Sequence, residues 1–91
     1  MSSEMPSLET LLQFPCAYTF RLVADVSVDL EIRCRAAAEE ALGRPMESVV
    51  FLPSRNGRYA VVRLKARVQS AEEVRCVHAA LAGIPGARTQ I

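Results

Sequence analysis

Residues 59–68 place positively charged side chains at alternate positions, which is the spacing of one face of a β-strand. Arg63, Lys65 and Arg67 share that face with Tyr59, whereas the opposite face is apolar throughout. Guanidinium and ammonium groups form charge-assisted hydrogen bonds with anionic oxygens. The stretch therefore predicts a strand that gives one face to the core and offers the other to an anionic partner.

Other reactive residue types form no recognisable catalytic or metal-binding set. His78 is the only histidine, and Cys76 lies two residues before it. On a helix this spacing turns the two side chains about 200° apart, so they cannot hold one metal ion. Residues 23–26 lack the glycine that an anion-binding loop of the acylphosphatase type needs. We therefore predict a protein that is not an enzyme and that binds no cofactor and no metal.

The length and composition of the chain predict a single small domain. Its 91 residues suffice for one modest core, and a net charge of +1 at pH 7 favours no class of partner. Three cysteines argue against a secreted disulfide framework, and the first residues lack a signal-peptide pattern. No apolar run approaches the roughly 20 residues of a membrane span. We expect a cytoplasmic protein without membrane contact.

Three further stretches have the apolar patterning and the length of β-strands. They are residues 18–23, 48–52 and 87–91. Asn56-Gly57 precedes residues 59–68 and predicts a hairpin with a two-residue type I′ turn, because both central residues of that turn need positive φ.

Two stretches have the apolar spacing of helices. The first covers residues 27–42 and stops at Gly43 and Pro45. The second opens with a capping box, in which Ser70 is the N-cap and Glu73 occupies the third helical position. Gly83 follows its apolar stripe and is the expected C′ residue.

This order of elements predicts an α+β fold, the ferredoxin-like β-α-β-β-α-β sandwich. Its four-stranded antiparallel sheet carries both helices on one face. Right-handed crossovers place the first and third strands in the middle and the second and fourth at the edges. We expect one ferredoxin-like domain over residues 14–91, after a loosely held extension over residues 1–13 that contains one helical turn at residues 7–12.

The sheet face without helices carries the candidate binding residues. They are Arg21, Tyr59, Arg63, Lys65, Arg67 and Arg88. Thr19 and Gln90 are expected on the same face, which should hold no acidic side chain. Such a face is often only solvated by long charged side chains, but a face of one sign is less usual because like charges repel across strands. We interpret it as a contact surface for an acidic protein or an anionic metabolite.

The alternative function is binding of single-stranded RNA by the same face. RNA-recognition motifs share this topology and stack bases on aromatic residues of neighbouring strands. Here Val61 and Leu64 stand where aromatic residues would be needed, and Tyr59 alone is a poor stacking platform. RNA binding is therefore the second choice.

Residues 48–52 are apolar on both faces although they form an edge strand of the predicted sheet. An unprotected apolar edge invites pairing with another strand. We expect a homodimer in which the edge around Val49 and Phe51 pairs with a second copy to give a continuous eight-stranded sheet. Coverage of this edge by residues 8–14 is the alternative.

Taken together, these stretches resemble the YbeD-like family of small, uncharacterised bacterial proteins. The resemblance rests on Leu11-Leu12-Gln13-Phe14-Pro15 leading into residues 18–23, on Pro53-Ser54-x-x-Gly57-x-Tyr59, and on the final strand with Arg88. The chain departs from the family pattern at Ala24-Asp25, where a glycine is usual, and it lacks a histidine often found in the first helix.

The resemblance implies a ferredoxin-like fold close to ACT regulatory domains, which bind small metabolites and mostly act as dimers. It also implies a gene-neighbourhood link to lipoate metabolism, and hence a metabolic enzyme as partner. It implies no catalytic residues. We expect a regulatory or adaptor domain of a bacterial cytoplasm.

Overall fold

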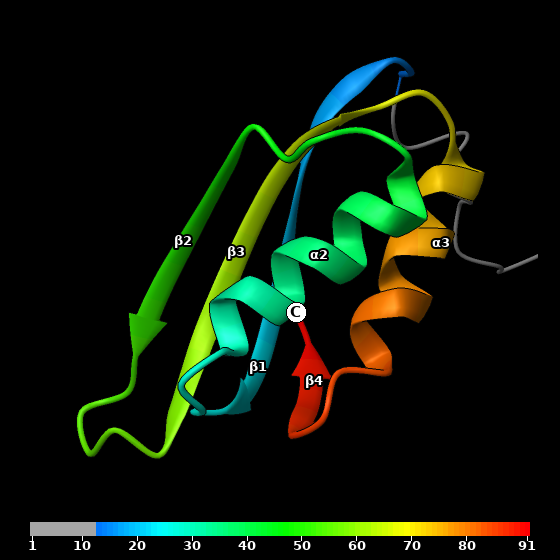
Figure 1. The fold of residues 1–91 in the computed structure, drawn as a ribbon. Coiled ribbons are helices and arrows are strands. Elements are labelled where there is room, and N and C mark those ends of the chain that lie inside the picture. Colours follow the sequence, from blue (N-terminus) through cyan, green and yellow to red (C-terminus); the bar gives the residue numbers. More distant parts are fainter. Residues whose placement is uncertain (1–12) are drawn as a thin grey trace, which may run out of the picture.

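A four-stranded antiparallel sheet carries two helices on one face in the computed structural model, which describes residues 13–91 (Figure 1). The elements follow the predicted order: β1 (Cys16–Asp25), α2 (Leu30–Leu42), β2 (Ser48–Pro53), β3 (Tyr59–Val68), α3 (Ala71–Ala82) and β4 (Ala87–Gln90). The helical turn expected at residues 7–12 lies outside the described residues, as does nearly all of the expected extension.

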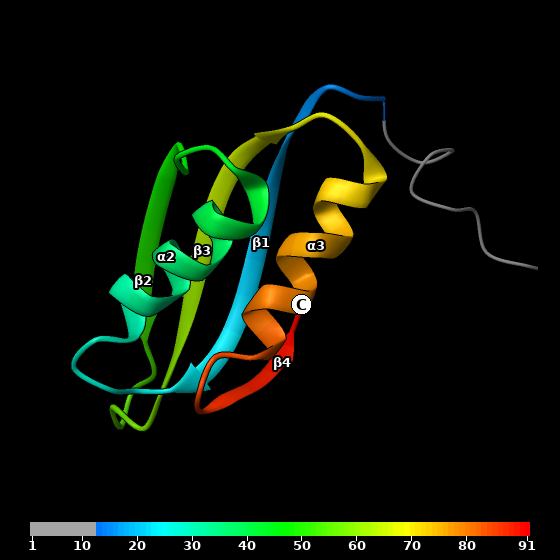
Figure 2. The ribbon, with the colours of Figure 1, turned by 45° about the vertical axis from the view of Figure 1, so that its right-hand side comes forward.

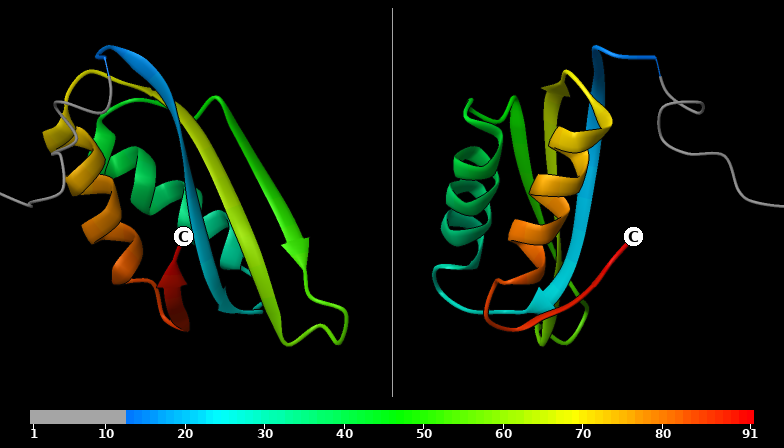
Figure 3. Two further views of the ribbon diagram at one scale, coloured as in Figure 1. Left: turned by 180° about the vertical axis from the view of Figure 1, so that it is seen from behind. Right: turned by 90° about the vertical axis from the view of Figure 1, so that its right-hand side faces the viewer.

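The strand order is β2-β3-β1-β4, so the ferredoxin-like topology is confirmed, with the first and third strands in the middle. All three pairs of neighbouring strands are antiparallel. Helix α2 lies over the β2 side of the sheet and α3 over the β4 side (Figures 2 and 3). The opposite face of the sheet, which we call the open face, has no helix of the described chain on it.

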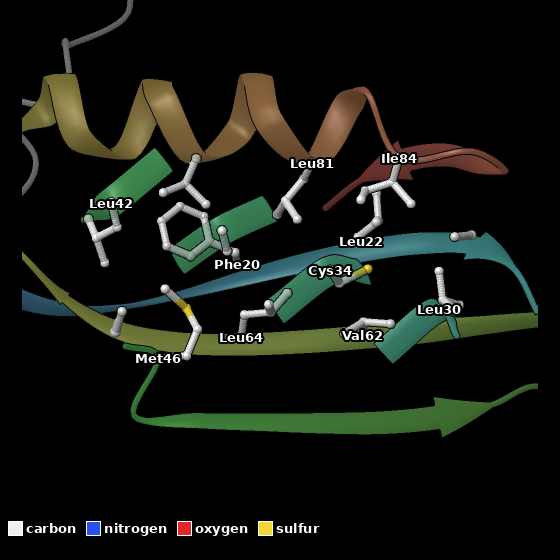
Figure 4. Packing of buried hydrophobic residues seen from close by; sticks show 14 of the residues in the cluster. Phe20, Leu22, Leu30, Cys34, Leu42, Met46, Val62, Leu64, Leu81 and Ile84 are labelled. Carbon is white, nitrogen blue, oxygen red and sulfur yellow. The ribbon is translucent and has the colours of Figure 1, made fainter. Parts of the chain in front are cut away.

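The core lies between the sheet and the two helices and is aliphatic apart from one ring (Figure 4). Period-two alternation supplies its sheet layer, since every second residue of β3 from Ala60 to Val68 is buried. Helical spacing supplies the other layer, which includes Leu30, Cys34, Ala38 and Leu42 of α2 and Val74, Val77 and Leu81 of α3.

The β2–β3 hairpin forms where Asn56-Gly57 predicts it, but its turn is not of type I′. Gly57 has φ +76°, whereas no residue other than glycine has positive φ in residues 13–91. The Asn56 side-chain oxygen accepts hydrogen bonds from the Arg58 N–H and the Ser54 hydroxyl, both at 3.0 Å. The Ser54 hydroxyl accepts in turn from the Tyr59 N–H at 3.1 Å. These side-chain bonds stabilise a wider loop that needs only one left-handed residue.

Helix α2 begins at Leu30, three residues later than expected. Asp29 is its N-cap but makes no capping bond with its side chain, because Arg33 and Ser27 engage the carboxylate at 2.6 and 3.2 Å. Gly43 ends the helix in the left-handed conformation, with φ +78°.

The capping box of α3 is half confirmed. The Ser70 hydroxyl accepts the Glu73 N–H at 3.3 Å, as predicted. The Glu73 carboxylate, however, accepts the Gln69 N–H at 2.7 Å rather than that of Ser70, and it also binds Arg44. At the other end Gly83 is the C-cap with φ −86°, so the expected left-handed C′ conformation is absent there.

His78 of α3 packs against two aromatic rings of β1. Its ring centroid lies 5.3 Å from that of Phe20 and 6.0 Å from that of Tyr18. Partial burial disfavours the charged imidazolium, which lowers the pKa of His78 from 6.5. The side chain therefore belongs to the boundary of the core.

Truncation of Leu64 tests the packing of the core. Leu64→Ala should lower the free energy of unfolding by about 2–5 kcal/mol, because it opens a cavity at a fully buried position. Leu52→Ala is the matched control at a position that is 39 % exposed, and it should cost less than about 1 kcal/mol. Urea unfolding followed by circular dichroism measures both values. Equal losses would contradict the described burial.

The single histidine gives a direct test of its surroundings by an NMR pH titration. We expect the midpoint of the His78 ring signals below 6.5 in the folded protein. Because the unfolded chain takes up the proton more readily, the stability contribution is present above about pH 6.5 and is lost as the pH falls through the folded-state pKa. A midpoint at or above 6.5 would show that the imidazole is not desolvated.

Candidate functional site

Four cations lie together on the open face, and we call Arg21, Arg63, Lys65 and Arg67 the basic stripe. Arg63, Lys65 and Arg67 alternate along β3, and Arg21 of β1 stands directly opposite Arg63. All four side chains are exposed. Within residues 13–91 none of them has a carboxylate partner. The sequence prediction for these four positions on the sheet is thus met.

The pair Arg21–Arg63 brings two like charges into the closest cross-strand position. The Arg21 carbonyl accepts the Ile91 N–H at 3.0 Å and so points away from β3. Arg21 and Arg63 therefore form a non-hydrogen-bonded pair, in which Cα atoms lie about 4.5 Å apart. Like charges in this position lower stability by roughly 0.2–1 kcal/mol.

An apolar strip lies beside the basic stripe and consists of Val23, Val50, Leu52 and Val61. Leu52, Val61 and Val23 form one row across three strands, and Val50 stands opposite Arg63. Val50 is 42 % exposed and Leu52 39 %. Between this strip and the hairpin is an open hollow of about 360 Å³, lined in part by Val23, Leu52, Val61 and Tyr59.

Arg88 and Tyr59 reach the same face, but they are engaged with an acidic residue that the sequence analysis did not place there. The Arg88 Nε lies 2.7 Å from Asp25 Oδ1, and the guanidinium lies 4.8 Å from the centre of the Tyr59 ring. The hydrogen bond to Asp25 raises the pKa of Arg88. The expectation of a face without acidic groups is wrong. Strand β1 extends to Asp25, which lies four residues after Arg21 and therefore on the same face of the sheet.

Gln90 does not lie on the open face, contrary to the sequence expectation. It pairs with Leu22, and its Nε2 donates to the His78 carbonyl of α3 at 2.8 Å. The register of β1 and β4 shifts between Val23 and Ala24. Because of this irregularity, the side chains at the end of β4 lie on the face opposite to the one that simple alternation predicts. Thr89, which pairs with Val23, takes the place on the open face.

Val49 and Phe51 lie at the β2 edge, as expected, with half-buried side chains that pack against the core. The apolar side chains exposed on β2 are instead those of Val50 and Leu52. The alternation of side chains along residues 48–52 separates these two sets. The sequence could have identified the exposed set once one residue of the strand was known to face the core.

The cations of the helical layer differ from the basic stripe in having acidic partners. The ion pairs are Arg33–Asp29, Arg35–Glu39, Arg44–Glu73 and Arg75–Glu72. The bond from Arg44 also lowers the pKa of Glu73. In the described part of the chain, the cations without an acidic partner are thus the basic stripe on the sheet and Arg55 and Arg58 in the β2–β3 hairpin.

Two of the three free thiols in the described residues favour the protonated form. Burial raises the pKa of the Cys34 thiol to about 11, and burial together with Glu72 raises that of Cys76. Residues 13–91 contain no group of three His, Cys, Asp or Glu side chains arranged to hold a metal ion. None of their helices is long and apolar enough to cross a membrane.

Solved structures with the same arrangement are known from H. pylori and Thermotoga maritima. The solution structure of protein HP0495 from H. pylori matches with a TM-score of 0.69 at 16 % identity, over 99 % of this chain and 98 % of that one. The uncharacterized protein TM1266 from Thermotoga maritima matches with a TM-score of 0.58 at 14 % identity, over 82 % and 92 % of the two chains. At these identities the likeness concerns the fold alone.

Relatives at the sequence level carry descriptions without a function. UPF0250 proteins of Shewanella sp. strains ANA-3 and MR-4 are each 30 % identical over 80 residues, which cover 88 % of this chain and 90 % of theirs. The family model described as "Protein of unknown function (DUF493)" matches residues 9–90. These matches confirm the resemblance to the YbeD-like proteins, and the chain belongs to the DUF493 family.

Proposed function

We propose that this chain is a non-enzymatic regulatory or adaptor domain that binds an acidic segment of a protein partner on the open face. The observation that carries the proposal is the basic stripe, four exposed cations without a carboxylate partner in residues 13–91. We place this activity in the cytoplasm, since Cys16, Cys34 and Cys76 are all free thiols.

The repulsion between Arg21 and Arg63 favours an anion at this point. A carboxylate placed between the two guanidinium groups would replace a repulsive contact by two attractive ones. Charge-assisted hydrogen bonds contribute about 1.5–3 kcal/mol each where water is excluded. The neighbouring Val50 and Val61 offer the apolar surface that excludes it.

The dimensions of the basic stripe favour a polypeptide over a small metabolite. Arg63 and Arg67 are four residues apart on one strand, which corresponds to about 14 Å. Several anionic groups spread over that length are typical of a protein segment. The hollow near Leu52 is open to solvent, whereas small-molecule pockets bury about 70–90 % of their ligand.

The positions of the aromatic rings weigh against the alternative of RNA binding. The Tyr59 ring is covered on one face by Arg88, and Tyr18 and Phe20 pack beside His78 on the helical side. Bases would therefore find no pair of exposed rings on β1 and β3. The basic stripe would still attract phosphates, so RNA has to be a competitor in the test.

Binding of a labelled peptide that alternates Glu and Leu tests the proposal by fluorescence anisotropy. The stripe variant carries Arg63→Gln, Lys65→Gln and Arg67→Gln. The matched control carries Arg33→Gln, Arg35→Gln and Arg75→Gln, which removes the same charge from the helical side. We expect the stripe variant to lose affinity by about tenfold or more and the control to stay within about twofold of the wild type.

Two competitors in the same assay separate the alternatives. Oligouridine that binds more tightly than the peptide would replace the proposal by RNA binding, and inorganic phosphate that displaces the peptide at low concentration would indicate a small anionic ligand. Equal losses in the two variants would mean that only net charge matters. No binding of the peptide to the wild type would overturn the proposal.

A further inference from the structure

The outer edge of β2 presents a short run of backbone groups without partners in the described chain. The Ser54 N–H donates to the Tyr59 carbonyl at 2.7 Å, which makes these residues a hydrogen-bonded pair. Antiparallel strands alternate the direction of their backbone groups, so Val49, Phe51 and Pro53 point away from β3. Proline has no N–H, which leaves two complete donor–acceptor sets, those of Val49 and Phe51.

The side chains of β2 do nothing to keep another strand away. Edge strands are usually protected by charged residues, by a bulge or by a covering segment. Residues 48–53 contain no charged residue, and the β2–β3 register runs without irregularity from Ser48 to Pro53. Pro53 limits the length of the edge without blocking its centre.

We propose that β2 pairs in antiparallel fashion with β2 of a second copy, around a two-fold axis that passes between the two Val50 residues. In this register Val49 faces Phe51 of the second copy, and Phe51 faces its Val49. Each of these two pairs exchanges both N–H···O bonds, so the complete donor–acceptor sets of Val49 and Phe51 are satisfied. The two-fold symmetry also gives a closed assembly, which stops at two chains.

Each neighbouring register leaves the carbonyl of Val49 or of Phe51 without a donor. A two-fold axis at Phe51 would place Val49 opposite Pro53 of the second copy, which has no N–H to give. An axis at Val49 would place Phe51 opposite Glu47, whose N–H already donates to the Lys65 carbonyl at 2.7 Å. Only the register centred on Val50 therefore pairs both the N–H and the C=O of Val49 and of Phe51.

Side chains agree with this register on both faces of the joined sheet. On the helical face a β-branched residue meets an aromatic ring twice, Val49 against Phe51, which is a favourable cross-strand pair. On the open face Val50 meets Val50, and Leu52 meets Ser48. Val50 is therefore covered by Val50 of the second copy, and Leu52 is covered by its Ser48.

The paired sheet would also align the two open faces. Val50 stands opposite Arg63, which stands opposite Arg21, so one row would read Arg21, Arg63, Val50 and then the same residues in reverse. Three strand spacings would separate the two Arg63 positions by about 14 Å. The inference does not depend on the proposed function, because the edge pairing uses backbone groups that the basic stripe does not need.

Disulfide trapping tests the register. In a background with Cys16→Ser and Cys76→Ser, which keeps the fully buried Cys34, Val50→Cys places two thiols across the axis. The non-hydrogen-bonded position has a Cα separation of about 4.5 Å, within the range of a disulfide. Leu52→Cys is the matched control, since its two copies would be offset by about 14 Å along the strands. Under mild oxidation we expect a covalent dimer from Val50→Cys at least about tenfold faster than from Leu52→Cys.

Sedimentation equilibrium provides a readout without cross-linking. Val50→Lys places the ammonium groups of the two copies opposite each other across the axis, and we expect it to weaken the dimer by about tenfold or more. Val28→Lys is the control at a fully exposed position outside the sheet, and it should leave the dimer unchanged. Circular dichroism checks that both variants fold. A wild type that stays monomeric at high micromolar concentration, or equal cross-linking from both cysteine positions, would overturn the inference.

Discussion

The ladder between β1 and β3 determines both the core and the charged open face of this domain. The two strands are 10 residues long each and pair along their whole length, from Cys16–Val68 to Asp25–Tyr59. Because side chains alternate, a shift by one residue would turn the buried set outward and the basic stripe inward. Burial of side chains such as Leu22 and Leu64 contributes about 1.5–3 kcal/mol each. This exceeds the roughly 0.2–1 kcal/mol lost between Arg21 and Arg63, so the core holds the like charges together.

Separation of paired and unpaired charge follows from this arrangement. The helical layer places acidic and basic residues three or four positions apart, where they reach one another. On β3 the alternate positions are all basic from Arg63 to Arg67, and the facing residues of β1 beyond Arg21 are uncharged. The proposed binding depends on side chains of the open face, and the proposed pairing depends on backbone groups of the β2 edge. Val50 takes part in both, as apolar surface beside Arg63 and as the residue at the two-fold axis.

The sequence predicts the fold well because its strongest signals are local and mutually consistent. Alternation in residues 59–68 specifies the central strand, Ser70 specifies the start of α3, and the element order leaves one topology with right-handed crossovers. The turn type could not be predicted, because the side chains of Ser54 and Asn56 compete with the backbone for hydrogen bonds in the hairpin.

The details of the site were less accessible to sequence reasoning, for reasons that are equally physical. Asp25 extends β1 beyond its apolar pattern, and it meets Arg88 only because the last strand folds back beside the first. Gln90 changes face because the β1–β4 register is irregular, which no periodicity of a four-residue strand can reveal. The basic stripe was predicted in full, since its positions depend on alternation alone within two long strands.

Chemical-shift mapping with an acidic peptide tests the central claim most directly. The ¹⁵N-labelled protein would be titrated with the Glu/Leu peptide at low and at moderate salt. The account predicts that the largest changes fall on Arg21, Arg63, Lys65 and Arg67 and on the adjacent Val50 and Val61, and that they shrink as salt screens the charges. Changes centred on the exposed sides of α2 and α3, or none at all, would contradict it.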